Sequence, residues 1–321
     1  MFDVDRLLAV DAPLRQAQRA TSAGTRAGTG TALVVGGSSG IGLASARELI
    51  VRGYLVVLMA RDADRLTVAA QELGSGTTAA PADLLDADAV AQVVQDILAK
   101  HGALDVVVHT AQVMAYGRIE DVPQDIFERT VETATHGTAN LARAVLPVFR
   151  RQGHGSLIVV NSLLGHIVVP EMGTYVTAKW AQLAMIRTLQ LETRDAPEIH
   201  ISEVSPGAID TPIYEQAANY TGRTPAPPPP VLSPAVMGRA VADCIDTPHK
   251  HVDVGPGNKI VTLGFRLLPW VYDRLVGPLA QLAVFRGSDV PPSDGNVLAP
   301  MPDRESERGG WSLLAMRRRR E

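Results

Sequence analysis

The chain has 321 residues and a mass of 34.2 kDa; 46% of the residues are hydrophobic and 20% charged, which suffices for one large packed domain and excludes a wholly disordered protein. The 30 basic and 34 acidic residues leave a formal net charge of −4, so no overall positive charge attracts nucleic acid, and a small-molecule partner is expected. The single cysteine, Cys244, excludes an intramolecular disulfide and a cysteine-rich metal site, so no metal is expected and a reducing, cytoplasmic location is favoured.

Residues 1–30 are expected to form a short amphipathic helix and a linker rich in threonine, serine and glycine. From residue 31 to about 258, short apolar runs alternate with segments of helical periodicity, which is the pattern of repeated β-α-β units. Strands are expected at residues 32–35, 55–59, 104–108, 157–160, 199–204 and 252–254. Because these runs are apolar throughout, we expect a parallel sheet covered by helices on both faces.

Three segments towards the C-terminus depart from this alternation. Residues 213–233 contain five prolines and are expected to be irregular, either as a stiff surface loop or as a lid over a substrate. Residues 259–286 have the pattern of an amphipathic helical extension, and their uncharged stretch is too short for the ~20 residues of a membrane span. Residues 287–321 are rich in proline, glycine and serine, end in four consecutive arginines, and are expected to be a disordered tail.

A glycine-rich turn follows the first expected strand. Gly36, Gly40 and Gly42 precede a good helical segment, and glycine allows backbone N–H groups to approach a pyrophosphate at a helix N-terminus. Ser38 and Ser39 lie within the same turn and are candidate cofactor contacts. The spacing differs from the G-x-G-x-x-G of the best-known dinucleotide enzymes, so a purely structural turn is the alternative.

The residues at the end of the second strand indicate whether NAD or NADP is the preferred coenzyme. A carboxylate there binds the ribose 2′-hydroxyl of NAD, whereas an arginine accommodates the 2′-phosphate of NADP. The chain has Ala60 followed by Arg61, with Arg65 one turn further on, which favours NADP(H); ordinary solvated charges are the alternative. Asp83, after the third strand, is placed either to bind the adenine amino group or to cap a helix.

Ser162, Tyr175 and Lys179 form the most specific pattern. Tyr175 and Lys179 are four residues apart in a helix expected from about residue 173 to 194, so they share a face. An ammonium group near a phenol should lower the tyrosine pKa and suit it to proton transfer. Ser162, at the end of the preceding strand, can orient the reacting oxygen.

Together these motifs resemble the short-chain dehydrogenase/reductase (SDR) family, over about residues 31–255. The resemblance implies a single three-layer α/β/α Rossmann domain with a sheet of about seven parallel strands. It makes Tyr175 the general acid/base, Lys179 its electrostatic partner and a ribose ligand, and Ser162 the residue that orients the substrate.

The same resemblance implies the coenzyme contacts. The pyrophosphate turn would be Gly36, Gly40 and Gly42, with Ile41 touching the coenzyme. Asp83 and Leu84 would form the adenine pocket, and the Ala111 backbone would contact the nicotinamide ribose. The nicotinamide carboxamide would be lined by Pro206, Gly207, Ile209 and Thr211.

The chain departs from the family pattern beside the site. The family's Asn-Asn-Ala-Gly is replaced by residues 109–112, His-Thr-Ala-Gln, where His109 is either a proton relay or a structural group. The helix asparagine that holds a relay water in many members falls on Ala134, for which Thr133, Thr135 or His136 are candidate substitutes.

The leading hypothesis is an NADP(H)-dependent oxidoreductase acting on a carbonyl or secondary alcohol. The alternative is a dinucleotide-binding sensor or scaffold of little activity, suggested by Ala134 and Gln112. From the resemblance we expect a homo-oligomer paired through residues 124–151 and 173–194. Residues 259–285 are expected to pack on the core or another subunit, with peripheral membrane contact as a less favoured alternative.

Overall fold

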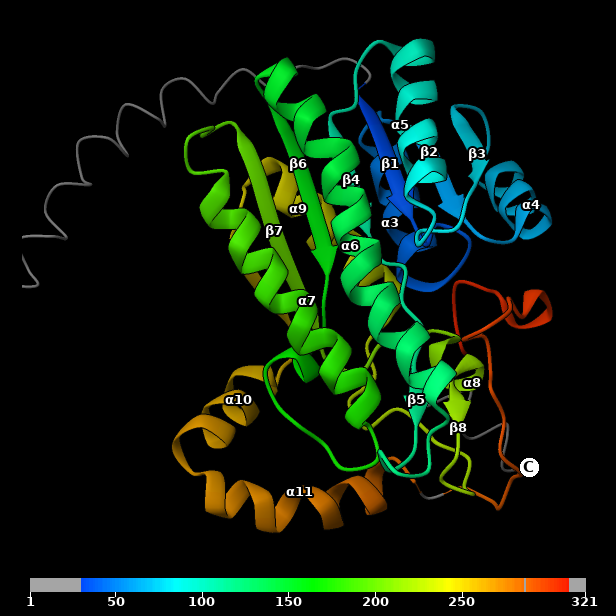
Figure 1. The fold of residues 1–321 in the computed structure, drawn as a ribbon, viewed down its shortest axis with the longest axis vertical. Coiled ribbons are helices and arrows are strands. Elements are labelled where there is room, and N and C mark those ends of the chain that lie inside the picture. The colour runs from blue at the N-terminus through cyan, green and yellow to red at the C-terminus, as the bar shows by residue number, and fades with distance from the viewer. Residues whose placement is uncertain (1–29, 286, 312–321) are drawn as a thin grey trace, which may run out of the picture.

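The computed structural model describes residues 30–285 and 287–311. Its centre is a seven-stranded parallel sheet in the order β3-β2-β1-β4-β6-β7-β9 (Figure 1). The strands are β1 Thr31–Val35, β2 Leu55–Ala60, β3 Thr77–Pro81, β4 Val106–His109, β6 Gly155–Val160, β7 Ile199–Pro206 and β9 His251–Val254. The predicted fold class is confirmed. The apolar runs do not mark β3, because its sequence Thr-Thr-Ala-Ala-Pro contains no large apolar residue.

Helices cover both faces of the sheet, each over its own apolar core. One face carries α5 Ala87–His101, α6 Gln124–Gln152 and α7 Gly173–Glu192, which bury residues such as Ile97, Phe149 and Ile186. The other carries α3 Gly40–Val51, α4 Ala63–Leu73 and α9 Pro234–Asp246, with Leu49, Leu66 and Met237. This three-layer arrangement hides both sides of the strands, as their unbroken apolar sequences predict.

The carboxyl ends of the strands meet at the lower edge of the sheet in Figure 1. The chain crosses from one side of the sheet to the other between β3 and β4, so the strand order reverses at the boundary of β1 and β4, and such a point leaves a crevice outside the strand ends. Around it lie the short elements η1 Leu163–Gly165, α8 Ile213–Gln216 and the paired strands β5 Ala115–Tyr116 and β8 Ala218–Asn219.

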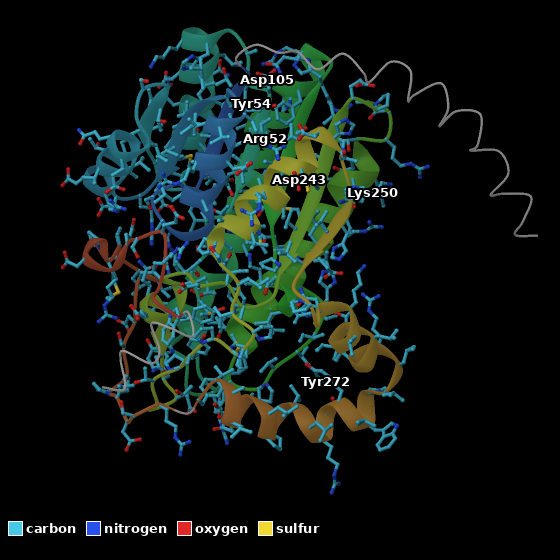
Figure 2. The ribbon with its side chains drawn as sticks, turned by 180° about the vertical axis from the view of Figure 1, so that it is seen from behind. Arg52, Tyr54, Asp105, Asp243, Lys250 and Tyr272 are labelled. Atoms are coloured by element: carbon cyan, nitrogen blue, oxygen red, sulfur yellow. The ribbon has the colours of Figure 1, made fainter. Side chains whose placement is uncertain are left out.

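Two helices cover this edge of the sheet. They are α10 Asn258–Leu267 and α11 Pro269–Ala283, which together we call the roof (Figure 1). Tyr272, labelled in Figure 2, fastens the roof by donating a hydrogen bond from its hydroxyl to the carbonyl of Val168 at 2.7 Å. No helix in the described ranges is long and apolar enough to cross a membrane.

The prediction of a disordered tail is wrong for residues 287–311, which we call the C-terminal segment. It runs back along the carboxyl edge of the sheet, includes η2 Pro302–Arg304, and buries Val297 and Trp311. Its low apolar content ruled out a core of its own, but its backbone pairs with the body of the domain, as between the Gly40 amide and the Ser306 carbonyl at 2.9 Å. The expected N-terminal helix and linker, and the terminal arginines, lie outside the described residues.

Candidate active site

The structure brings Ser162, Tyr175 and Lys179 together at the end of β6. Tyr175 lies in the first turn of α7 and Lys179 one turn later, while Ser162 follows β6 and precedes η1. Ser162 lies near enough to Tyr175 to affect the pKa of its hydroxyl, and the Lys179 ammonium lies 5.7 Å from the centre of the Tyr175 ring. All three side chains are buried. The arrangement expected from the sequence is therefore present.

Burial dominates the electrostatics of these groups. It raises the pKa of Tyr175, an effect that nearby Tyr214 reinforces and the Ser162 hydrogen bond opposes. It also lowers the pKa of Lys179 to about 7, against the attraction of Glu203. The expected lowering of the tyrosine pKa by Lys179 is thus not found, because loss of hydration dominates and raises the pKa.

Lys179 has a partner that the sequence reasoning missed. Its ammonium donates to Gln182 Oε1 at 2.8 Å and to the Val160 carbonyl at 3.1 Å. Gln182 Nε2 in turn donates to Thr138 Oγ1 at 3.0 Å, and that hydroxyl donates to the Ala134 carbonyl at 2.6 Å. A signal was available, since Gln182 stands three residues after Lys179 on the same helix.

None of the substitutes considered for the missing asparagine takes that role in the structure. The hydroxyls of Thr133 and Thr135 donate to carbonyls of their own helix, at Arg129 and Val131. His136 is exposed on the outside of α6. Ala134 itself is fully buried, and its methyl group cannot hydrogen-bond a water.

His109 fits the structural alternative rather than the proton relay. It is 1% exposed, and its Nε2 lies 3.1 Å from Thr138 Oγ1. Burial and the nearby Lys179 charge lower its pKa to about 3, so the imidazole is neutral.

Most of the predicted coenzyme residues line one cavity, of about 170 Å³, which we call the glycine-turn cavity. They are Gly36, Ser38, Ser39, Gly40, Ile41, Gly42, Arg61, Asp83, Leu84, Ala111 and Thr211. Gly36 and Gly40 have φ values of 82° and 52°, in the left-handed region that favours glycine. A Cβ at Gly36 would come within 2.6 Å of Thr110 Oγ1, so the turn also needs glycine for close packing.

Asp83 is held by protein groups at this cavity. It accepts a hydrogen bond from the Leu85 amide and forms an ion pair with Arg129 at 2.5 Å. The backbone bond and Arg129 outweigh the effect of burial and hold the pKa of Asp83 below its ordinary value. The cap of α5 is Asp86, whose side chain accepts from the Ala89 amide. Arg129 also lines the cavity and was not among the residues predicted from the sequence.

Arg61 and Arg65 differ in their positions. Arg61 lines the glycine-turn cavity and donates to the carbonyls of Asn296 and Val297, at 2.9 and 3.3 Å. Arg65 does not line it and pairs with Glu72 at 3.5 Å, although its Nε is buried without a hydrogen-bond partner among the described residues. The C-terminal segment adds Asn296, Pro300 and Glu305 to the wall. These residues were missed because the segment was expected to be disordered.

A second, larger space of about 630 Å³ adjoins the first, and we call it the apolar cavity. Ser162, Tyr175 and Lys179 line it, as do the predicted Pro206, Gly207, Ile209 and Thr211. Pro228 and Pro229 of the proline-rich loop and one side of the roof complete the lining, which favours the lid interpretation of residues 213–233. Among the described residues, Lys179 is the only charged side chain in the lining.

The two cavities share Ile41, Thr110, Gln112, Thr211 and Ile213. A long ligand can therefore extend from Arg61 to Tyr175. At the junction, Gln112 Oε1 is buried without a partner within the described ranges, so a donor group of a ligand would satisfy it. The residues present thus fit a dinucleotide whose adenosine end lies near Arg61.

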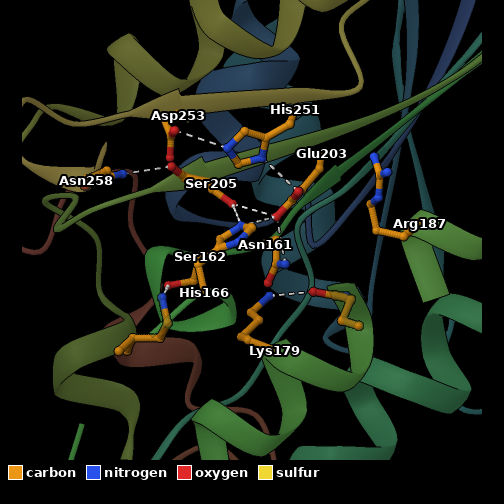
Figure 3. A network of polar contacts seen from close by, with 12 residues as sticks. Asn161, Ser162, His166, Lys179, Arg187, Glu203, Ser205, His251, Asp253 and Asn258 are labelled. Carbon is orange, nitrogen blue, oxygen red and sulfur yellow. Dashed lines mark hydrogen bonds and ion pairs between the residues drawn. The ribbon is translucent and has the colours of Figure 1, made fainter. Parts of the chain in front are cut away.

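A buried carboxylate, Glu203, lies near Ser162 and Lys179 (Figure 3). Its oxygens accept from His166 at 2.8 Å, Ser205 at 2.7 Å, Asn161 at 2.9 Å and His251 at 2.8 Å. Burial would raise its pKa, but these hydrogen bonds prevail and lower it. The ligand atoms of Glu203, His166 and His251 lie within 4.8 Å of one another, and each already takes part in a hydrogen bond.

Comparison with known proteins agrees with this geometry. A family model for short chain dehydrogenase matches residues 30–220. The chain is 32% identical over 199 residues to "Dehydrogenase/reductase SDR family member 7B" of Danio rerio, covering 59% of this chain and 64% of that protein. The chain thus spans slightly less than two thirds of that relative's length.

Solved structures give the same picture. An alcohol dehydrogenase from Thermococcus sibiricus complexed with 5-hydroxy-NADP has a TM-score of 0.61 and 29% identity, covering 70% of this chain and 95% of its own. A 3-ketoacyl-(acyl-carrier-protein) reductase from Brucella melitensis complexed with NADH shares the fold, with a TM-score of 0.65 and 24% identity, covering 71% and 98%.

The chain belongs to the short-chain dehydrogenase/reductase family. The resemblance inferred from the motifs is confirmed. The roof and the C-terminal segment lie beyond the matched residues, so what they add to the site must be derived from this chain alone.

Proposed function

We propose that the protein is an NADP(H)-dependent oxidoreductase that interconverts a carbonyl and a secondary alcohol. The observation that carries this proposal is the grouping of Ser162, Tyr175 and Lys179 in the lining of the apolar cavity, next to the glycine-turn cavity. When bound, the nicotinamide supplies or accepts the hydride at the substrate carbon. The protein must then position the substrate and move one proton at the substrate oxygen.

In this proposal the two hydroxyl groups hold the substrate oxygen. Ser162 orients it, and Tyr175 donates its proton as a carbonyl is reduced or receives one as an alcohol is oxidised. A tyrosine with a raised pKa is a weak acid on its own, so it depends on a nearby cation as negative charge forms on its oxygen. Lys179 supplies that cation, and Gln182 and the Val160 carbonyl orient its ammonium.

We further propose that the substrate is large, apolar and uncharged. Apolar side chains of the roof, of η1 and of α8 line most of the apolar cavity, whereas polar groups gather at Ser162, Tyr175 and Lys179. This distribution suits a molecule with one reactive oxygen at the end or side of a hydrophobic body. A charged substrate would lose its hydration and find no partner other than Lys179 among the described lining residues.

NADP(H) is proposed over NAD(H) because β2 ends in Ala60, without a carboxylate, and Arg61 follows it at the wall of the glycine-turn cavity. The test is NADPH oxidation by a series of alkyl ketones and aldehydes of increasing length, with short and carboxylated carbonyls for comparison. We expect kcat/KM to rise with apolar length and to collapse in Tyr175→Phe. NADPH binding without turnover of any carbonyl would instead support a dinucleotide-binding sensor.

A cytoplasmic location and a homo-oligomer paired through α6 and α7 remain predictions. So does the expectation that the outer face of the roof packs on another subunit or contacts a membrane. That face exposes Ile260, Leu263, Leu267, Trp270 and Leu282. Gel filtration with light scattering tests the second, and flotation with liposomes tests whether the roof contacts membranes.

A further inference from the structure

Glu305 lies at the adenosine end of the glycine-turn cavity, although it is far from that site in sequence. The C-terminal segment is fixed there on both sides of the residue. The Gly40 amide donates to the Ser306 carbonyl at 2.9 Å, and Gln216 Nε2 donates to the Arg304 carbonyl at 3.2 Å. Glu305 therefore belongs to the wall of the cavity, together with Ser38 and Arg61.

The Glu305 carboxylate faces groups of both signs. Burial, with the nearby Asp62, raises the pKa of Glu305, while the nearby Ser38, Arg65 and Arg61 side chains oppose the change. One of its oxygens, Oε2, is buried without a hydrogen-bond partner among the described residues, and the same holds for Arg65 Nε. An unsatisfied acceptor, Glu305 Oε2, thus belongs to a residue of the cavity wall, whereas the unsatisfied donor, Arg65 Nε, belongs to a residue outside the lining.

The chemistry of that position distinguishes the two coenzymes. The residue after this strand faces the adenosine ribose, where a carboxylate accepts a hydrogen bond from a free 2′-hydroxyl and an arginine pairs with a 2′-phosphate. The strand itself ends in Ala60, so it offers no carboxylate. Glu305 brings one from the C-terminal segment to the same place, beside the arginine.

We propose that Glu305 is a coenzyme-specificity residue, whose carboxylate competes with the 2′-phosphate of NADP(H) for Ser38 and Arg61 and accepts a hydrogen bond from the 2′-hydroxyl of NAD(H). The inference rests on the proposed function only in requiring that the glycine-turn cavity holds a dinucleotide. Arg61 favours the phosphate and Glu305 opposes it. The ratio of the two affinities reflects the balance between these residues.

The carbonyls of Asn296 and Val297 support this arrangement. They hold the Arg61 guanidinium from the side of the C-terminal segment, so the segment that carries Glu305 also orients the arginine. Burial is the main cause that lowers the pKa of Arg61, with Arg129 adding to it, while Asp83 and Glu305 oppose the change. A 2′-phosphate would have to replace Glu305 as a counter-charge of this buried group.

The test is a double-mutant cycle on coenzyme binding in the full chain. Dissociation constants for NADPH and NADH are measured by fluorescence titration at fixed ionic strength, for wild type, Glu305→Gln, Arg61→Ala and the double variant. We expect Glu305→Gln to raise the affinity for NADPH relative to NADH by about tenfold, because the 2′-phosphate then no longer competes with a carboxylate for Arg61. In the Arg61→Ala background this gain should largely disappear, because the two residues act on the same phosphate.

Glu307→Gln is the matched control, since this neighbouring carboxylate pairs with Arg47 at 3.2 Å and does not line the cavity. Its affinity ratio should equal that of wild type. Limited proteolysis of residues 287–311 in each variant shows whether the segment stays docked. A ratio unchanged by Glu305→Gln, or a gain that persists without Arg61, would overturn the inference.

The proposed function can fail separately. If wild type binds both coenzymes but prefers NADH, the proposed NADP(H) preference is wrong, while an increase of the NADPH to NADH ratio in Glu305→Gln still supports the inference. If wild type binds neither dinucleotide, both proposals are wrong.

Discussion

Glu203→Gln should cause a large loss in the free energy of unfolding, larger than the loss of Glu198 or Glu305 would cause. The side chain is 1% exposed and accepts hydrogen bonds from four donors, on His166, Ser205, Asn161 and His251 (Figure 3). Glutamine keeps the shape but loses the charge and turns one acceptor oxygen into a donor NH₂ group. At least one of the facing donors then loses its acceptor inside the protein.

The magnitude follows from the burial and the charge of the partners. Breaking a buried charge pair by removing one member costs about 3 to 5 kcal/mol, because the remaining polar groups stay desolvated. A matched control is Glu198→Gln, which removes an exposed carboxylate just before the same strand. We expect that control to change the free energy of unfolding by less than about 0.5 kcal/mol.

The pH dependence gives the prediction a sign. Because the pKa of Glu203 is lowered, its carboxylate stabilises the fold fully at pH values above 4.5, the ordinary pKa of a glutamate. This stabilisation is lost as the pH falls further. The hydrogen bond that His251 donates to Glu203 raises the pKa of His251, so the contribution of this pair to stability is full below 6.5 and is lost as the pH rises past the higher folded pKa. The stability difference between wild type and Glu203→Gln should therefore be largest near about pH 5.5 and smaller at about pH 9.

Urea unfolding followed by circular dichroism, at both pH values, measures this difference. A loss below about 1 kcal/mol at the lower pH would refute the assignment of Glu203 as a buried anion. So would a loss of the same size at both pH values, because it would mean that the charge of His251 plays no part.

Three further changes test the site. Tyr175→Phe should reduce kcat by about 10² to 10⁴ and leave the NADPH dissociation constant within a few-fold, as judged by steady-state rates and titration; retention of most of the activity would exclude Tyr175 as the proton donor. Arg61→Ala should weaken NADPH by about tenfold and NADH little, and equal losses would mean that Arg61 does not contact the 2′-phosphate. Ala134→Asn should lower kcat, because Ala134 is fully buried and its carbonyl is already bonded to Thr138; a faster enzyme with a changed solvent isotope effect would show that a missing relay limits turnover.

The sheet and the catalytic residues could be predicted because local sequence determines them. An apolar run such as residues 55–59 has only one suitable environment, between two layers of helices. The four-residue spacing of Tyr175 and Lys179 fixes their common face once α7 is a helix. The glycines of the turn were predictable for a similar reason, since the positive φ of Gly36 and its contact with Thr110 exclude larger side chains.

The partners of these residues could not be predicted, because they depend on contacts between distant segments. Arg61 is identifiable as a candidate phosphate ligand from its place after β2. Nothing near it in the sequence indicates that it donates hydrogen bonds to the carbonyls of Asn296 and Val297. The C-terminal segment is too poor in apolar residues to fold alone. It is ordered because its backbone groups find acceptors and donors on a surface that already exists.

For the roof, the sequence predicts the helices but not what their apolar face contacts. Its periodicity predicts an amphipathic helical extension, and the usual inference is that the apolar side packs on a core. In the structure, residues such as Val261, Val271 and Val276 instead line the apolar cavity beside Tyr175. Periodicity reports only that a face avoids water, and a substrate cavity satisfies that condition as well as a packed core does. The apolar inner face of α10 and α11 is therefore better explained as a surface for substrate, which is why the proposed substrate is large and uncharged.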